Sequence, residues 1–323
     1  MKLISFVIPC YRSSQTICSV VSEISSLFSK NYKNKYDYEI ILVNDASPDD
    51  TLDKIKEICH INKKVKGINL AKNFGQHSAL MAGFRFITGE YVVCLDDDGQ
   101  TPANQVFELI NAIEEGYDVV YAQYQEKRHS LFRNIGSRIN DFMARILINK
   151  PKELYLSSYF ACRAYVIKEM IKYDNAYPYM MGLVLRTTIN ITNVKVVHRE
   201  RINGESGYTL KSLLALWLNG FTNFSVKPLR IASLVGAILF IISMVFSIVL
   251  FLRKIFEPTI QMGYTSIMLT MILFGSIQLL SIGLLGEYIG RIFICINKSP
   301  QYVIKEVINS EEVIENDEIR KAI

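Results

Sequence analysis

Three consecutive aspartates, Asp96, Asp97 and Asp98, directly follow an apolar run at residues 92–95 that has the length of a buried strand. Carboxylates that are crowded at the edge of a core repel one another and lose hydration, so the cluster indicates a site where a cation binds. Alternate carboxylates such as Asp96 and Asp98 are hard oxygen ligands for Mg²⁺ or Mn²⁺, which commonly bridge to the phosphates of a substrate. A D-x-D pair is a weak signal by itself. The strand before it and the proline turn after it favour a metal-phosphate site.

Strand-length and helix-length segments alternate in the first part of the chain, and these elements would position the cluster. Near-continuous apolar runs of strand length lie at residues 3–9, 38–45, 65–71, 90–96 and 117–123. Apolar residues at helical spacing lie between them, at residues 16–30, 50–62 and 75–87. This alternation, with strands buried on both faces, predicts an α/β fold with a mixed, mostly parallel sheet. Ligands of such sheets bind beyond the carboxyl ends of the strands, where Asp45 and the three aspartates fall.

The C-terminal third contains two uncharged segments. Residues 231–252 carry no charged side chain, and neither do residues 258–286, of which 264–285 is the part expected to span. Each is long enough to cross a hydrocarbon core of roughly 30 Å as a helix, so we expect two C-terminal transmembrane helices. A buried hairpin of a soluble protein is the alternative. Because the N-terminus lacks the pattern of a signal peptide, we expect a multi-pass protein of the cell inner (cytoplasmic) membrane, with the N-terminal domain and both termini in the cytoplasm.

Composition sets limits on partners and compartment. Half of the 323 residues are hydrophobic, the mean hydropathy is +0.19 and the formal net charge is +5. This excess is too small to indicate nucleic-acid binding, yet it suits a protein that lies on an anionic membrane. The six cysteines form no C-x-x-C pair and are expected to be reduced thiols.

The segments predict three parts of the chain. A cytoplasmic domain is expected at 1–228, with amphipathic interface helices at about 130–148 and 209–226. A two-helix membrane region is expected at 229–290 and a cytoplasmic tail at 291–323. No Walker-type glycine loop is present, and no G-x-G-x-x-G follows the first strand, so neither a P-loop phosphotransferase nor a dinucleotide oxidoreductase is indicated.

The chain resembles the family-2 glycosyltransferases of GT-A fold in four segments, in order and spacing: FVIPCYRSSQTI, ILVNDASPDDT, KNFGQHSALMAGF and LDDDGQTP. Two later segments narrow the resemblance: VHRERINGESGYTLKSLLALWLNGFTNFSVKPLR, and LLGEYIGRIF followed by KSPQYVI. They are similar to the polyprenyl-phosphate glycosyltransferases, relatives of dolichol-phosphate mannose synthase and of the bacterial undecaprenyl-phosphate glucosyl- and aminoarabinosyltransferases. The resemblance covers nearly the whole chain.

This resemblance implies roles for individual residues. Asp96 and Asp98 match the family's D-x-D pair, with Asp98 the stronger candidate ligand and Mg²⁺ or Mn²⁺ the cofactor. Contacts to the nucleotide sugar are implied for Pro9, Tyr11, Asp45, Lys72, Asn73, Gly75, Gln76, Asp97 and Gln100. The segment RINGESGY implies contacts to the acceptor phosphate by Arg201, Ser206 and Tyr208, and Arg201 is also counted among the catalytic residues.

Several of these residues have purely local interpretations. Tyr11 fits a strand-end aromatic, Asp45 fits an Asx turn in NDASPDD, and Asp97 stands where the family often has alanine and fits a side chain that faces water. The segment RINGESGY fits an exposed polar loop. Lys72 replaces the family's usual arginine, so a two-point phosphate contact becomes a point charge.

One position departs from the family's pattern. The family usually has an acidic residue, often proposed as the catalytic base, six positions before an arginine, and counting back from Arg163 reaches Ser157. The nearest carboxylate is that of Glu153. Either Glu153 moves in, or the base is dispensable, or activity has been lost. A lipid monophosphate is mostly dianionic at neutral pH and needs positioning more than proton removal, so Ser157 mildly favours a phosphate acceptor.

The expected reaction is an inverting transfer of a sugar from a nucleotide sugar, uridine-diphosphate-linked by family habit, to polyprenyl (undecaprenyl) phosphate in the membrane. The product serves cell-envelope glycan modification. A transferase acting on a hydroxyl, and a catalytically lapsed nucleotide-sugar-binding sensor or scaffold, are the alternatives. A processive polysaccharide synthase is disfavoured because the single tryptophan, Trp217, lies outside any Q-x-x-R-W segment. Gly236, Gly283 and Gly286 would let the spans pack in a homo-oligomer.

Overall fold

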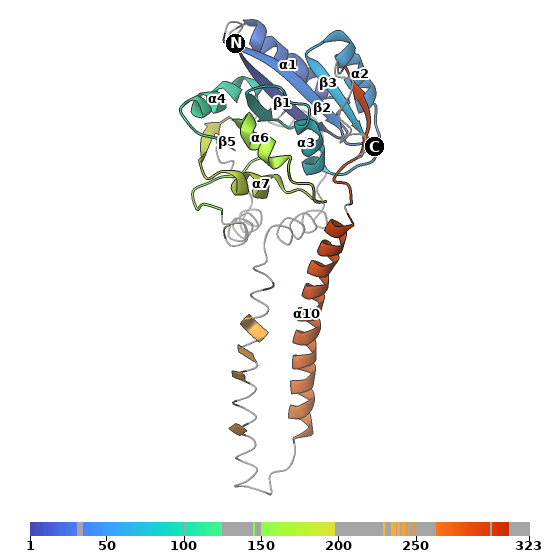
Figure 1. Cartoon of the computed structure of the whole chain (residues 1–323), viewed down its shortest axis with the longest axis vertical. Coiled ribbons are helices and arrows are strands. Elements are labelled where there is room, and N and C mark those ends of the chain that lie inside the picture. Colours follow the sequence, from blue (N-terminus) through green and yellow to red (C-terminus); the bar gives the residue numbers. More distant parts are fainter. Residues whose placement is uncertain are drawn as a thin grey trace.

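The computed structural model describes residues 1–30, 35–99, 101–124, 150–197, 263–297 and 299–309, together with residue 145 and scattered positions between 229 and 249. The N-terminal residues form an α/β domain, and a long helix extends from it (Figure 1). The two interface helices expected near 130–148 and 209–226 lie outside the described residues, apart from residue 145, which is helical.

An eight-stranded sheet forms the centre of the domain, in the order β7-β5-β6-β4-β1-β2-β3-β8. The strands are β1 (Lys2–Cys10), β2 (Tyr36–Asn44), β3 (Val65–Leu70), β4 (Tyr91–Cys94), β5 (Val119–Tyr124), β6 (Phe160–Arg163), β7 (Ile191–Val196) and β8 (Ile304–Ile308). The pairs β4-β1, β1-β2, β2-β3 and β5-β7 are parallel. Strand β6 is antiparallel to β4 and β5, and β8 is antiparallel to β3. The sheet is therefore mixed and mostly parallel, as the sequence predicts.

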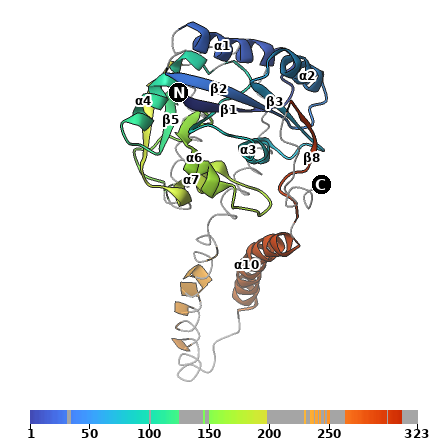
Figure 2. The same ribbon diagram turned by 45° about the horizontal axis from the view of Figure 1, so that its top comes forward.

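Helices cover both faces of the sheet (Figure 2). One face carries α1 (Ile17–Lys30), α2 (Thr51–Ile61) and α4 (Val106–Glu114), which begins after the short 3-10 helix η1 (Ala103–Gln105); the other carries α3 (Gln76–Phe84), α6 (Ala164–Met170) and α7 (Met180–Thr187). Both faces need cover because successive side chains of a strand point to opposite sides. In β1, Phe6 and Ile8 point into one core while Val7 points into the other. Helix α3 packs tightly on this sheet at Gly83, where a Cβ atom would lie 2.6 Å from Cγ1 of Val7.

The five strands and three helices expected in the first 125 residues are all present. Strands β6, β7 and β8 were not expected from the sequence. The boundary of the expected tail also needs correction, because helix α10 (Tyr264–Ile296) runs past residue 291 and residues 304–308 form β8. The segment IKEVI is short and carries two charges, so only its long-range pairing with β3 reveals it as a strand.

Helix α10 has the properties of a membrane span. It contains Phe274–Ile294, a stretch long and apolar enough to cross a membrane. Unlike those of a core helix, its large apolar side chains are mainly exposed, as at Leu279 and Phe293. This helix corresponds to the second expected span. The described positions between 229 and 249 are helical, and the rest of the first expected span lies outside the described residues.

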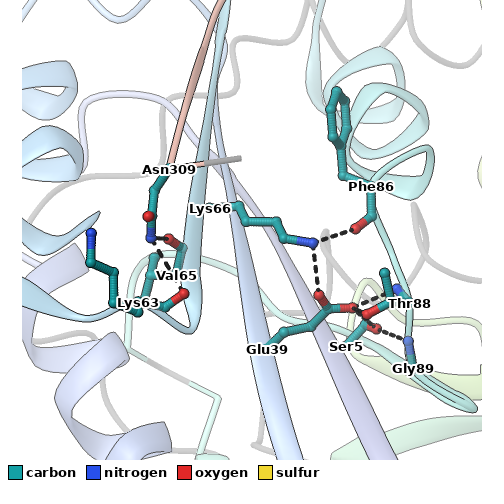
Figure 3. Close-up of polar contacts among 9 residues, drawn as sticks. All are labelled: Ser5, Glu39, Lys63, Val65, Lys66, Phe86, Thr88, Gly89 and Asn309. Carbon is teal, nitrogen blue, oxygen red and sulfur yellow. Dashed lines mark hydrogen bonds and ion pairs between the residues drawn. The ribbon is translucent and has the colours of Figure 1, made fainter. Parts of the chain in front are cut away.

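A buried ionic network lies toward the amino ends of the parallel strands (Figure 3). The Glu39 carboxylate accepts hydrogen bonds from Ser5 Oγ at 2.6 Å, Thr88 N at 2.5 Å and Thr88 Oγ1 at 2.9 Å. It also pairs with Lys66 Nζ at 3.1 Å. Burial alone would raise the pKa of Glu39, but these donors outweigh it and the pKa is lowered. The network joins β1, β2 and β3 at the end of the sheet away from Asp45.

Candidate active site

The acidic cluster directly follows β4, at the carboxyl ends of the parallel strands. Leu95 N donates to Val7 O at 3.3 Å, so the chain leaves the sheet beside β1. The side chains of Asp96, Asp97 and Asp98 are all partly buried. Burial of three neighbouring carboxylates is unfavourable unless donors or a cation compensate it. The contacts of each aspartate therefore indicate its role.

Asp96 is held by two neutral donors from different elements. Gln76 Nε2, in the first residue of α3, donates to Asp96 Oδ1 at 2.9 Å, and Ser158 Oγ donates to Oδ2 at 2.5 Å. Burial, together with the nearby charges of Asp98 and Asp97, raises the pKa of Asp96 to about 6 despite these donors. A cation bound next to Asp96 would favour its ionised form.

Asp97 anchors the β1–α1 loop instead of facing water. Its Oδ2 accepts hydrogen bonds from Tyr11 N at 3.2 Å and from the Ser13 hydroxyl. Burial raises the pKa of Asp97. The alternative in which Asp97 simply faces solvent is therefore wrong. Tyr11 remains 44% exposed, with the Arg12 guanidinium 5.6 Å from the centroid of its ring.

Asp45 organises residues 71–76, here called the donor loop. Its two carboxylate oxygens accept hydrogen bonds from Phe74 N at 2.7 Å and Gly75 N at 2.8 Å. Asp45 does not make the expected Asx turn: in this segment Asp49 Oδ1 accepts the hydrogen bond from Thr51 N, two residues further on, at 3.3 Å. Burial raises the pKa of Asp45. Asp45 thus shapes the loop that the sequence assigns to the nucleotide.

The donor loop exposes its polar side chains. Lys72 and Asn73 are exposed, and Lys72 Nζ lies 5.0 Å from the centroid of the Phe74 ring. Gly75 has a φ of +88°, a backbone conformation that residues with a side chain rarely adopt. Space does not require a glycine here, because an added Cβ atom would meet no other atom within 4 Å. The glycine therefore serves the backbone turn that starts α3. This turn brings Gln76 to Asp96, while the Lys72 side chain stays exposed.

The Ser157 hydroxyl is already engaged in hydrogen bonds with neighbouring groups. Its Oγ accepts a hydrogen bond from Tyr159 N at 3.2 Å, and its side chain is buried. It also shares a hydrogen bond with Tyr124, whose pKa is raised by burial. Glu153 is exposed. The neighbour Ser158, which the sequence did not single out, is the serine that reaches Asp96, and its position next to Ser157 was the only available signal.

The remaining candidates divide into three groups. Pro9 is buried within β1, where it pairs in register with Val43, so it supports the strand end. Gln100 lies outside the described residues. So do the three candidates for the acceptor phosphate: Arg201, Ser206 and Tyr208. The structure therefore brings together Tyr11, Asp45, the donor loop and the three aspartates.

The donor set fits a divalent cation that shares its ligands with a substrate. Among the described residues, no group of three or more His, Cys, Asp or Glu side chains forms a complete metal cage. Mg²⁺ and Mn²⁺ bind well to one or two carboxylates when phosphate oxygens and water complete the shell. The partly buried oxygens of Asp98 and Asp96 would supply that partial set. The three aspartates thus lie at the sheet edge where the sequence predicts a metal-phosphate site.

Solved structures support this class of fold. The chain matches the crystal structure of M. tuberculosis glucosyl-3-phosphoglycerate synthase in complex with Mn²⁺, uridine diphosphate and phosphoglyceric acid with a TM-score of 0.51. The match covers 68% of this chain and 76% of that one at 20% sequence identity. A second match, titled a mycobacterial protein, has a TM-score of 0.52 at 21% identity and covers 68% of this chain and 73% of that one. The fold is therefore of the GT-A type.

Sequence comparison then defines the family. The model of glycosyl transferase family 2 matches residues 5–171, and that of the GtrB C-terminal hairpin matches residues 227–292. A putative glycosyltransferase, CsbB, of Bacillus subtilis is 33% identical over 98% of this chain and 96% of its own length. The undecaprenyl-phosphate 4-deoxy-4-formamido-L-arabinose transferase of Yersinia pestis is 31% identical over 99% of this chain and 98% of its own length. The chain belongs to glycosyl transferase family 2, in its polyprenyl-phosphate branch.

Proposed function

We propose that this glycosyltransferase moves a sugar from a uridine-diphosphate-linked donor to undecaprenyl phosphate in the membrane, with inversion at the anomeric carbon. The observation that carries the proposal is the joint placement of the donor loop and the aspartate cluster at one sheet edge, in a chain that continues into an apolar helix. The name of the Yersinia relative, similar over nearly its full length, supports the acceptor. The product would be a polyprenyl-monophosphate sugar for cell-envelope glycan modification.

On the donor side, each residue has a defined task. The Tyr11 ring would stack on the base, and the donor loop fixed by Asp45 would follow the ribose and diphosphate. Lys72 would neutralise phosphate charge. Asp98, with Asp96 beside it, would hold Mg²⁺ or Mn²⁺, which stabilises the negative charge of the departing diphosphate. Gln76 and Ser158 keep Asp96 in its orientation.

On the acceptor side, the surroundings of Ser157 favour a nucleophile that needs no base. The Ser157 hydroxyl has no appreciable basicity and is already hydrogen bonded, and Glu153 is exposed. A phosphate monoester is largely dianionic at neutral pH, so its oxygen attacks without losing a proton. A sugar or lipid hydroxyl would need a carboxylate in this place. We assign the grip on the acceptor phosphate to Arg201, Ser206 and Tyr208.

The membrane arrangement follows from the same proposal. Two spans would place the protein in the cytoplasmic membrane as a multi-pass protein, with its catalytic domain and both termini in the cytoplasm. Nucleotide sugars are made in that compartment, and the lipid phosphate would meet the domain at the membrane surface. Helix α10 supports the second of these spans.

A transfer assay tests the proposal. Purified full-length protein in nanodiscs with Mn²⁺ and undecaprenyl phosphate would be given radiolabelled nucleotide sugars one at a time, and label would be counted in the organic extract. We expect one donor to label the lipid, and Asp98→Asn to abolish the label. Measurable donor binding without lipid label from any donor would contradict the proposed acceptor and favour a hydroxyl acceptor or a sensor.

A further inference from the structure

The residues that follow α10, numbered 299–309 and here called the strap, are fixed to the α/β domain at both ends. At the near end, Gln301 Nε2 donates to Asn175 O at 3.0 Å and to Tyr173 O at 3.3 Å. At the far end, Asn309 Nδ2 donates to Val65 O at 2.7 Å and to Lys63 O at 3.3 Å (Figure 3). Each end is therefore held by a side-chain amide that reaches backbone carbonyls.

Between these two ends the strap packs against the domain as the edge strand of the sheet. Strand β8 pairs with β3, Glu306 forms an ion pair with Lys56 at 3.1 Å, and the Tyr302 side chain is 9% exposed. Ile304 and Ile308 pack against opposite cores of the sheet. Separation of the strap would expose apolar surface and leave an unpaired sheet edge, so it stays docked in the folded protein.

The strap also reaches the donor loop. Ala71 N, the first donor-loop amide, donates to Val303 O at 2.9 Å. The other end of the loop is held by the bonds from Phe74 and Gly75 to Asp45. Its last residue, Gln76, contacts Asp96. A short series of direct contacts therefore links the strap to the acidic cluster.

The connection from the strap to α10 is short. Asn297 N donates to Phe293 O at 3.0 Å and Ser299 N donates to Ile294 O at 3.4 Å, so the helix is capped close to the strap. The chain from Ile296 to Gln301 spans at most about 18 Å even when fully extended. The donor loop is consequently confined to the neighbourhood of one end of the apolar helix.

We propose that the strap is a positioning tether, which holds the donor loop at a set height over the membrane surface so that a membrane-held phosphate meets the sugar. This inference rests on the proposed function. Its physical basis is proximity: two reactants held in register react as if highly concentrated, and a loose connection lowers that effective concentration. A strand that merely covers a sheet edge would affect stability but not the choice between membrane-held and soluble acceptors.

The test inserts a flexible eight-residue Gly-Ser segment between Ser299 and Pro300 of the full-length protein. The insertion adds an r.m.s. span of about 16 Å but breaks none of the bonds of the strap to the domain. The matched control carries the same insertion after Glu315. Turnover is measured with undecaprenyl phosphate in lipid vesicles and with a short-chain, water-soluble polyprenyl phosphate in detergent, together with the KM for the donor.

We expect the first insertion to lower vesicle turnover about tenfold relative to the control, with less than a twofold change in donor KM and in detergent turnover. Hydrogen exchange at residues 304–308 should remain slow in both variants, which would show that β8 is still paired. A second variant, Gln301→Ala with Asn309→Ala, should lower vesicle turnover about threefold by loosening both ends.

Three results would overturn the inference in different ways. Equal vesicle turnover in the two insertion variants would exclude a tether, and so would an equal loss in vesicles and in detergent. Wild-type protein that labels neither polyprenyl phosphate would refute the proposed function itself, and the tether with it.

Discussion

Glu39, toward the amino ends of the parallel strands, and Asp96, at their carboxyl ends, are both carboxylates withdrawn from solvent, but their partners differ in charge. Glu39 has an ammonium group, that of Lys66, at 3.1 Å as well as hydroxyl and amide donors, and its pKa is lowered. Within the described ranges, the donors to Asp96 are the neutral groups of Gln76 and Ser158, two more aspartates follow it, and its pKa is raised to about 6. The amino-end network pairs its carboxylate with a positive charge, whereas the carboxyl-end cluster would gain stability from a bound cation. A raised pKa with like charges nearby is typical of a functional site.

The largest effect is expected at the carboxyl end, from Asp98→Asn. The change removes a hard anionic ligand while it conserves shape, so we expect kcat to fall by about 10³-fold, within the range for loss of a main electrostatic contact. The melting temperature should stay within about 2 °C of wild type, because relief of like-charge repulsion offsets small local losses. Lipid labelling and thermal unfolding in detergent measure the two quantities. Activity that survives the change would remove Asp98 from the metal site.

Asp96→Asn should separate stability from activity. The amide keeps an acceptor for Gln76 and offers a donor to Ser158, but it removes a buried charge. We therefore expect a higher melting temperature at pH 7.5 and a turnover lower by about 10²-fold. A lower melting temperature would show that the neutral donors already satisfy the charge.

The pH dependence of Asp96 has a defined sign. Its pKa is about 6 in the folded protein against an ordinary 3.8, so the folded state binds the proton more tightly than the unfolded chain. Its contribution to stability is then greatest at low pH, falls as the pH rises from about 4 to about 6, and is constant above that. Because Mn²⁺ competes with the proton, Mn²⁺ affinity should weaken below pH 6, by at most about tenfold per pH unit. Titration calorimetry across pH 5 to 8 checks this, and Asp96→Asn should flatten the profile.

At the amino end, Glu39→Ala should affect stability alone. The change leaves the Ser5 and Thr88 donors without their acceptor, and the Lys66 ammonium without its counter-ion, at a cost of about 2–3 kcal/mol. For a domain of this size that corresponds to a fall in melting temperature of about 5–10 °C. Lys66→Met, which keeps the hydrogen bonds from Ser5 and Thr88 to Glu39, is the control and should cost less. A large loss of kcat in the folded Glu39→Ala protein would contradict the view that the amino-end network serves stability alone.

The smallest effect should distinguish two adjacent serines. Ser158→Ala removes one donor from Asp96, and we expect a fall in kcat of about five- to tenfold with weaker Mn²⁺ binding. Ser157→Ala should change neither quantity by more than about twofold, because Ser157 bonds to Tyr159 and Tyr124. Ser158→Thr should restore Mn²⁺ affinity. Equal effects of the two alanine changes would mean that Ser158 acts only through local packing.

The sequence predicted the sheet, and the edge on which Asp45 and the three aspartates lie, because both depend on local patterns. Continuous apolar runs such as β1 and β2 identify strands that are buried on both faces, and parallel strands carry their carboxyl ends to one edge. That rule alone brought Asp45 together with Asp96, although the two are far apart in the chain. The uncharged run that forms the first two thirds of α10 was evident for the same reason.

Other assignments depended on which groups meet in space. No local pattern distinguishes Ser158 from Ser157, or shows that Asp45 accepts its hydrogen bonds from the donor loop and not from its own turn. Strand β8 was hidden because its five residues become a strand only by pairing with β3 and packing on both cores.

The family, the sheet edge that holds the candidate site and the apolar helix can all be read from the amino-acid sequence. The partners of each carboxylate and the link from α10 to the donor loop emerge only when the chain is folded. The spacing of apolar residues shows which face of a helix or strand is buried. Hydrogen-bond partners come from segments that are distant in the chain and meet only when it folds, so no single segment specifies them.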